Sequence, residues 1–125
     1  MKMFFLYQII LTLILIVSPI IITFRVIKKK EDLKRFKEKF SITQEKRSNG
    51  NLIWFHGSSV GELMSIIPLI KYYEKNKLIN QILITSSTVS SSKIVKKLKF
   101  KKVVHQFYPI DQFFITSRFL NYWRP

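Results

Sequence analysis

The 125-residue sequence contains no cysteine and only two histidines. The missing cysteines exclude a disulfide framework, a thiolate metal site and a thiol nucleophile. His56 and His105 lie far apart in the sequence, so we expect no metal site. The sequence therefore predicts neither a disulfide-stapled nor a metal-dependent protein.

Acidic residues are also scarce: the chain has 7 aspartates and glutamates against 22 lysines and arginines, which gives a net charge of +15. The basic residues gather between Arg25 and Arg47 and between Lys93 and Lys102. Such clusters bind nucleic acid or anionic membrane lipid, or form a solvated surface that binds nothing. Because the aromatic residues are not interleaved with the basic runs as a base-stacking platform requires, we expect no nucleic acid partner.

Charge is absent from residues 3–24, an apolar run that covers roughly 33 Å as a helix and matches a hydrocarbon core of about 30 Å. A cleaved signal peptide would have a shorter apolar stretch and a small-residue cleavage site. We therefore predict a transmembrane anchor over residues 1–27. The excess of lysine and arginine after the run predicts a single-pass protein with most of its chain on the cytoplasmic side.

Two further segments follow the anchor. Residues 28–49 carry Lys–Glu pairs three and four positions apart, which predicts a basic helical neck. Residues 48–51, Ser-Asn-Gly-Asn, break this pattern. The remaining residues, 50–125, leave room for a small folded body with a modest core.

Within residues 50–125, apolar strand-like runs alternate with helical periodicity. The strand-like runs are residues 52–56, 81–85 and 101–107. Helical periodicity follows Ser59 and Ser92, and Asp111 is expected at the start of the last helix. This order predicts an α/β fold with a partial Rossmann-like parallel sheet. Ligands then bind beyond the carboxyl ends of the strands, in loops 56–62, 86–92 and 108–111.

The residues of these segments resemble bacterial 3-deoxy-D-manno-octulosonic acid (Kdo) transferases. The resemblance is carried by Leu-Ile-Trp-Phe-His-Gly-Ser-Ser-Val-Gly-Glu at 52–62, Ile-Leu-Ile-Thr-Ser-Ser-Thr at 82–88, Tyr-Pro-Ile-Asp at 108–111 and Phe-Leu-Asn-Tyr-Trp-Arg-Pro at 119–125. With the anchor it covers essentially the whole chain. Two departures are Gly57, where alanine is more usual, and Thr-Val-Ser-Ser at 88–91, where Thr-Pro-Thr-Gly is more usual.

The resemblance implies a glycosyltransferase of the inner membrane that acts in lipopolysaccharide biosynthesis. Such enzymes transfer Kdo from the donor substrate CMP-Kdo to a lipid A precursor, with inversion and without a metal or other cofactor. They have two Rossmann-like domains in a GT-B arrangement, and the second supplies most donor contacts. The chain is then a fragment: an anchor plus the first part of the acceptor-side domain. It is expected to be inactive unless a complementing chain supplies the donor domain.

The resemblance also implies roles for residues of the first loop. Glu62 matches the proposed general base, although the Ser-x-x-Glu spacing from Ser59 equally predicts a simple capping box. Gly61 would let substrate approach the backbone, or merely relieve crowding. Ser58 and Ser59 would bond acceptor oxygens, or one of them would cap the helix.

Other candidate acceptor contacts are less specific. His56 either contacts the acceptor or is a satisfied histidine at a strand end. Lys93, Lys96 and Lys97 either meet phosphates of the lipid acceptor or form a solvated surface. The competing hypothesis for the whole chain is a catalytically inert, membrane-anchored basic fragment that only associates with anionic lipid.

Overall fold

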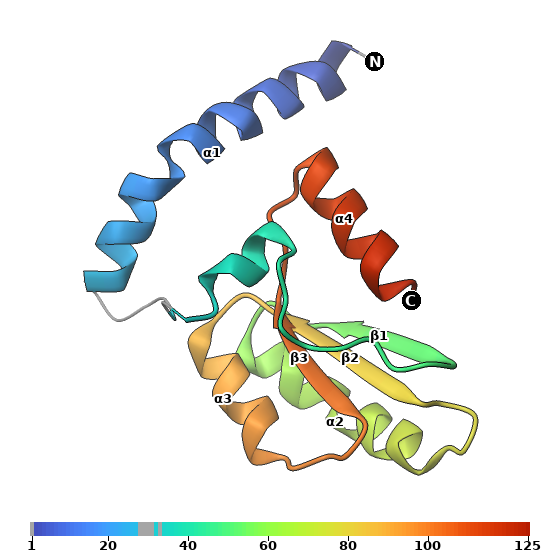
Figure 1. Ribbon diagram of the computed structural model, residues 1–125. Helices are drawn as coiled ribbons and strands as arrows, with labels where there is room; N and C mark the ends of the chain where they lie inside the picture. The colour runs from blue at the N-terminus through green and yellow to red at the C-terminus, as the bar shows by residue number, and fades with distance from the viewer. Residues whose placement is uncertain (1, 28–31, 33) are drawn as a thin grey trace.

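The computed structural model describes residues 2–27, 32 and 34–125, and its strands and helices alternate as the sequence predicts (Figure 1). The elements are α1 (Lys2–Ile27), η1 (Phe36–Phe40), β1 (Leu52–His56), α2 (Val60–Lys75), β2 (Gln81–Ser86), α3 (Val89–Lys97), β3 (Val103–Phe107) and α4 (Phe113–Trp123). The mixed α/β class and the parallel sheet are confirmed.

The three strands form one parallel sheet in the order β1-β2-β3. Trp54 pairs with Leu83, and Leu83 pairs with Val104, so β2 lies at the centre and all six of its residues are buried. A strand bounded by neighbours on both sides and helices on both faces has no solvent-facing side, which explains the continuous apolar run Ile-Leu-Ile.

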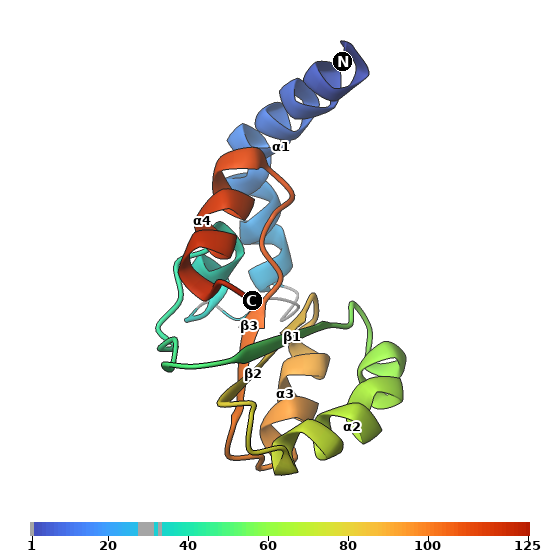
Figure 2. The same cartoon turned by 90° about the vertical axis from the view of Figure 1, so that its right-hand side faces the viewer.

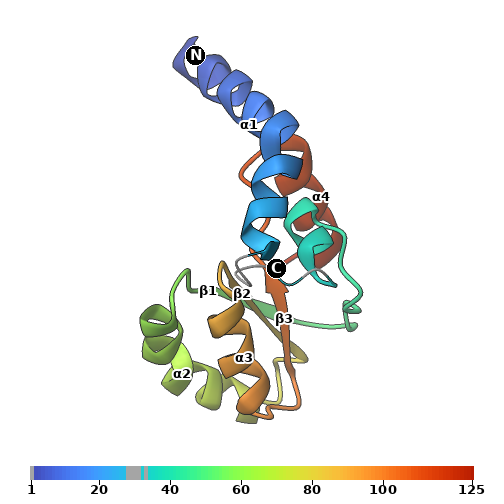
Figure 3. The same ribbon diagram turned by 90° about the vertical axis from the view of Figure 1, so that its left-hand side faces the viewer.

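Helices cover both faces of the sheet (Figures 2 and 3). On one face α2 and α3 contribute Leu63, Ile70 and Val95, which cluster with Ile82 and Ile84. On the other face Phe119 and Trp123 of α4 cluster with Leu83. The alternation of Ile82, Leu83 and Ile84 between the faces is the two-residue period of a strand.

Three predicted element boundaries are wrong. Helix α3 begins at Val89 and not after Ser92, because the Thr88 side chain caps it by accepting from the Ser91 N–H at 3.2 Å. Strand β3 begins at Val103, not at Lys101, because the backbone N–H groups of Lys101 and Lys102 donate to the Glu74 carboxylate, at 2.6 and 3.2 Å. Helix α4 is capped by Gln112, whose side chain accepts from the Phe114 N–H, and not by Asp111. The Asp111 carboxylate instead accepts from the Tyr7 hydroxyl at 2.6 Å, so it is engaged with α1.

Helix α1 is long and apolar enough over Met3–Ile27 to cross a membrane, with a mean hydropathy of 2.5. None of its most apolar stretch is buried against the rest of the chain. This length and composition agree with the predicted anchor, and they set α1 apart from α2, α3 and α4, which each bury one side chain or more.

The prediction of a helical neck is wrong for the described part of residues 28–49; residues 28–31 and 33 lie outside it. The only helix there is the five-residue 3₁₀-helix η1. The chain then packs along the body, where the Lys39 carbonyl accepts from the Ile110 N–H and the Arg47 Nε donates to the Trp123 carbonyl. An isolated polar helix is marginal in water, and these contacts give the backbone better partners.

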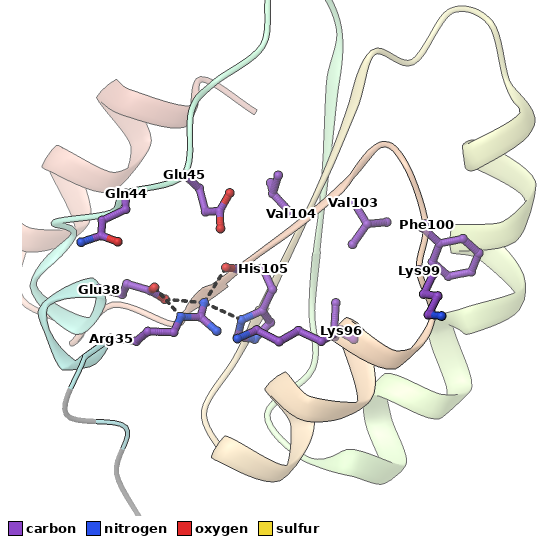
Figure 4. Close-up of a pocket in the computed structure, with 11 residues that line it drawn as sticks. Arg35, Glu38, Gln44, Glu45, Lys96, Lys99, Phe100, Val103, Val104 and His105 are labelled. Carbon is purple, nitrogen blue, oxygen red and sulfur yellow. Dashed lines mark hydrogen bonds and ion pairs between the residues drawn. The ribbon is translucent and has the colours of Figure 1, made fainter.

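A buried ion pair fastens this segment to strand β3 (Figure 4). Arg35 donates from Nε and Nη2 to the two carboxylate oxygens of Glu38, at 2.6 and 2.8 Å. Arg35 Nη2 also donates to the His105 carbonyl at 2.7 Å, and Glu38 Oε2 accepts from the Phe107 N–H at 2.8 Å. The pair thus bonds the outer edge of β3 as a neighbouring strand would, and the edge is not left open.

His105 extends this pair into the interior. Its Nδ1 accepts from Arg35 Nη2 at 2.9 Å, so the neutral ring carries its proton on Nε2, which lies 2.8 Å from Ser86 Oγ. Burial, with the charges of Arg35 and Lys96, lowers the pKa of His105 to about 3. The ring is therefore neutral at physiological pH and can accept from Arg35.

Arg35→Met is expected to destabilise the chain by about 3–5 kcal/mol, because it leaves the buried Glu38 carboxylate without its cation. The measurement is chemical denaturation in detergent. Adding Glu38→Gln, which removes the charge but keeps an acceptor for Phe107 N–H, should restore at least half of the loss. Lys71→Met on the exposed side of α2 is the control, with a change within about 0.5 kcal/mol. Equal stability of Arg35→Met and the wild type would contradict this role.

The stability of the chain is expected to fall as the pH drops from 7 to 5. The pKa of His105 is lowered in the folded state, so over this range the unfolded chain binds the extra proton and acid favours unfolding. The expected loss is about 2 kcal/mol, and His105→Gln should remove most of it. Denaturation at both pH values measures this. The same pH dependence in the variant would show that His105 is not the group responsible.

Candidate active site at the carboxyl ends of the strands

The carboxyl ends of the three strands meet at one edge of the sheet, and two of the loops that follow converge over β2. The Gly57 N–H donates to the Thr85 carbonyl at 3.0 Å, and the Tyr108 N–H donates to the Ser86 carbonyl at 2.9 Å. The first residue after β1 and the first after β3 are thus both fixed by the end of β2. This is the edge at which the sequence predicts the ligand site.

His56 joins these loops. Its ring packs against the ring of Tyr108 at a tilt of 41°, with 4.3 Å between centroids. Its Nδ1 lies 3.0 Å from Thr85 Oγ1, and its Nε2 lies 3.1 Å from Ser58 Oγ. Thr85 Oγ1 also accepts from the Trp54 indole N–H, which leaves its own proton for His56 Nδ1 and favours the tautomer protonated at Nε2. His56 therefore has partners for both ring nitrogens and orients Ser58.

Glu62 lies in the first turn of α2 with its side chain exposed. One carboxylate oxygen accepts from the Ser58 N–H at 2.8 Å, and the other accepts from the Ser59 hydroxyl at 3.3 Å. Ser59 is the N-cap, and its oxygen accepts from the Glu62 N–H. The capping arrangement is thus present, although Glu62 reaches the N–H of Ser58 and not that of Ser59. The same hydrogen bonds hold an accessible carboxylate in a fixed position.

Two glycines shape the loop between β1 and α2. A Cβ at Gly57 would lie 3.1 Å from Leu63 N, so the glycine lets the first turn of α2 approach the end of β1. A Cβ at Gly61 would meet nothing closer than Ser59 Oγ at 4.0 Å. Crowding within the chain therefore does not explain Gly61, and the space above it is open beside Glu62.

The lysines of α3 lie elsewhere. Helix α3 begins near the carboxyl edge of the sheet and runs back toward the amino edge (Figure 1), so its last turn, which contains Lys96 and Lys97, is the end of the helix further from that edge. Lys96 instead lines a pocket of about 310 Å³ with Arg35 and His105 (Figure 4). Lys93, one turn earlier, is exposed. The fold gathers His56, Ser58, Ser59, Gly61 and Glu62, and it separates them from Lys96 and Lys97.

Sequence reasoning missed two residues of this site, Thr85 and Tyr108. Thr85 is fully buried near the end of β2. Its hydroxyl interrupts an apolar run of the sequence, and this was the feature that could have indicated a site residue. Tyr108 opens the Tyr-Pro-Ile-Asp segment, but nothing local shows that its ring meets His56.

Among the described residues, no group of three or more histidines, aspartates or glutamates is placed to hold a metal ion.

Comparison with known proteins identifies the family of the chain. The family model described as 3-deoxy-D-manno-octulosonic-acid transferase (kdotransferase) matches residues 34–125, most of the chain. The chain belongs to the Kdo transferase family. The resemblance seen in the first loop is thereby confirmed over the whole folded body. No solved structure matches the chain, so the GT-B arrangement rests on the resemblance alone.

Two curated relatives within the family match nearly the whole chain, and a third matches 58% of it. The chain is 39% identical over 120 residues to the 3-deoxy-D-manno-octulosonic acid transferase of Rickettsia bellii, covering 96% of this chain and 29% of the relative. It is 37% identical over 124 residues to a probable mitochondrial enzyme of that name from Arabidopsis thaliana, covering 97% and 28%. The enzyme of Haemophilus influenzae is 32% identical over 73 residues. The chain thus spans less than a third of the length of these first two relatives.

Gly61→Ala is expected to stabilise the chain by up to about 1 kcal/mol, because alanine favours the helix and its Cβ meets open space. Gly57→Ala is the matched comparison and should be less stable than Gly61→Ala, because its Cβ would lie 3.1 Å from Leu63 N. Denaturation of both variants in detergent measures the difference. A loss of stability in Gly61→Ala would mean that crowding does account for this glycine.

Proposed function

We propose that this chain forms the acceptor side of an enzyme that transfers Kdo from CMP-Kdo to a lipid A precursor in lipopolysaccharide biosynthesis, with Glu62 as general base. The observation that carries the proposal is the Glu62 carboxylate, held by Ser58 and Ser59 in a Kdo transferase chain and exposed at the carboxyl edge of the sheet. A carboxylate fixed at a helix start, with space left above Gly61, suits a base that meets a large substrate.

The proposed reaction is a single displacement with inversion. A hydroxyl of the acceptor sugar attacks the anomeric carbon of Kdo, the bond from that carbon to the CMP phosphate breaks, and CMP leaves with the electron pair. Glu62 takes the proton of the attacking hydroxyl. Ser58 and Ser59 fix the carboxylate through a backbone N–H and a hydroxyl, and His56 fixes the hydroxyl of Ser58. We expect no metal and no cofactor besides the donor substrate.

The proposed location of the protein rests on α1 and on the basic residues that follow it. An apolar helix followed by lysines and arginines favours attachment to the inner membrane, with the folded body on the cytoplasmic side. Anionic lipid headgroups would attract these basic residues. Lys93 is exposed and is the lysine of α3 nearest the start of that helix, so we propose that it meets an acceptor phosphate; Lys96 and Lys97, in the last turn, would meet only a part of the acceptor that lies away from Glu62.

The donor side is proposed to come from sequence beyond these 125 residues, since the chain spans less than a third of its Rickettsia bellii relative and the family resemblance assigns most CMP-Kdo contacts to a second domain. That domain would follow in the same polypeptide or be supplied as a complementing chain. In either case, the site is completed across an interface with the carboxyl edge of the sheet.

Glu62→Gln is expected to reduce the turnover number roughly 100- to 10,000-fold while changing stability little, because the amide keeps the acceptor for Ser58 N–H but cannot take a proton. The experiment joins these 125 residues to the remainder of the Rickettsia bellii enzyme and follows Kdo transfer from CMP-Kdo to a lipid A precursor. Glu74→Gln, at the other end of the same helix, is the matched control and should keep its turnover number.

Two results would count against the proposal. Wild-type turnover in Glu62→Gln would show that this carboxylate only caps the helix. Failure of the chimera to transfer Kdo, when it binds CMP-Kdo and its denaturation remains cooperative, would favour an inert membrane-bound chain. The 125-residue polypeptide without a donor domain serves as the background, and we expect it to transfer no Kdo.

A further inference from the structure

A chain of hydrogen bonds runs from the interior of the folded body to the candidate active site. The Trp54 indole N–H donates to Thr85 Oγ1 at 2.9 Å, beneath α4, where the Trp54 ring packs against the Phe119 ring. Thr85 Oγ1 lies 3.0 Å from His56 Nδ1, and His56 Nε2 lies 3.1 Å from Ser58 Oγ. The chain thus begins in the core and ends at Ser58, whose side chain is exposed.

The buried end of this chain fixes the direction of its hydrogen bonds. An indole N–H can only donate, so Thr85 Oγ1 is the acceptor for Trp54. Thr85 is fully buried, and within the part of the chain that the structure describes its hydroxyl bonds only Trp54 and His56. If His56 Nδ1 carried a proton, the Thr85 proton would be buried without an acceptor, which costs free energy. Thr85 therefore donates to His56 Nδ1, and the neutral ring keeps its proton on Nε2.

The same direction continues at Ser58. Its oxygen accepts from the His56 Nε2–H, which leaves the Ser58 proton to be donated to another group. Among the described residues, no other side chain or carbonyl bonds Ser58 Oγ. The backbone N–H of Ser58 donates to the Glu62 carboxylate at 2.8 Å, so the two side chains are neighbours. The site therefore offers a ligand a hydroxyl donor beside a carboxylate acceptor.

Each strand of the sheet contributes to this arrangement. Trp54 belongs to β1 and Thr85 to β2, and Tyr108 follows β3 and packs its ring against that of His56. Rotation of the His56 ring would break its hydrogen bonds to Thr85 and Ser58 and would also separate it from Tyr108. The sheet thus holds the ring in one orientation, although His56 itself is exposed.

We propose that Ser58 donates a hydrogen bond to an oxygen of the acceptor sugar, beside the hydroxyl that Glu62 deprotonates. Trp54 and Thr85 are then positioning residues, which act through His56 to keep the Ser58 proton directed at the ligand. The group bound at Ser58 has to offer a lone pair, as a sugar hydroxyl or ring oxygen does. The identity of this ligand rests on the proposed function, whereas the direction of the hydrogen bonds does not.

The direction of the chain is tested by ¹⁵N NMR of the full 125-residue polypeptide in detergent, with labelled histidine, at mildly alkaline pH. The chain has only two histidines, so His105→Gln assigns the ring signals of His56. We expect a proton on Nε2 and a bare Nδ1. Thr85→Val, which removes the hydroxyl but keeps the shape, should give a mixture of the two tautomers, and Thr85→Ser should restore the single one. A proton on Nδ1 in the wild type would overturn the proposal.

The ligand is tested by kinetics of the chimera with the remainder of the Rickettsia bellii enzyme. Ser58→Ala keeps the backbone N–H that holds Glu62, and it should raise KM for the lipid A precursor about 3- to 10-fold, the loss of one hydrogen bond. Ser58→Thr, which keeps a hydroxyl, should recover most of this loss. Thr85→Val should raise the same KM, and adding it to Ser58→Ala should have no further effect, because Thr85 acts through Ser58.

The possible results separate this inference from the proposed function. An unchanged KM for the lipid A precursor in Ser58→Ala, in a chimera whose turnover Glu62→Gln lowers, would overturn the inference and leave the proposed function standing. A rise only in KM for CMP-Kdo would place the oxygen on the donor and would also overturn it. Additive effects of Ser58→Ala and Thr85→Val would show that Thr85 is merely structural. A wild-type chimera that transfers no Kdo would contradict the proposed function, and the tautomer of His56 would still decide the direction of the chain.

Discussion

The ion pair between Arg35 and Glu38 is the interaction on which the arrangement of this chain depends. It satisfies the outer edge of β3 with a guanidinium donor and a carboxylate acceptor, so a three-stranded sheet is closed on one side without a fourth strand. Because the pair belongs to the segment after α1, it also fixes the route of the chain from the apolar helix to the sheet. The neutral ring of His105 continues the network to Ser86, at the end of the central strand.

Ser86 and Thr85 connect this hydrogen-bond network to the candidate active site. The end of β2 bonds the loops that follow β1 and β3, and it thereby brings His56 onto Tyr108 and aligns the hydroxyl of Ser58. Glu62 then depends on Ser58 and Ser59 for its position. A helix cap and the proposed catalytic base make the same demand here, a carboxylate that cannot rotate freely, so one set of hydrogen bonds would serve both roles.

The apolar surface formed by α1 and the first turn of α4 lies on the face of the sheet opposite α2 and α3. Helix α4 packs Phe119 and Trp123 on the sheet while its first turn exposes Phe113 and Phe114 beside α1. In the proposed function, the lipid acceptor has an apolar part in the bilayer and a sugar that reaches Glu62. The proposed function would give these two surfaces a common purpose, since an enzyme that acts on a lipid acceptor works at the bilayer.

The sequence by itself determined the apolar helix, the order of strands and helices, and the first loop with its Ser-x-x-Glu pattern, because each is written in local periodicity or in a short motif. It did not determine the neck, where local Lys–Glu spacing predicted a helix but Arg35 and Glu38 found stronger partners 70 and 69 residues away in β3. Nor did it show that Thr85 and Tyr108 surround His56, or that Tyr7 bonds Asp111. These are contacts between residues distant in sequence, and only the packing of the sheet and its helices brings them within hydrogen-bonding distance.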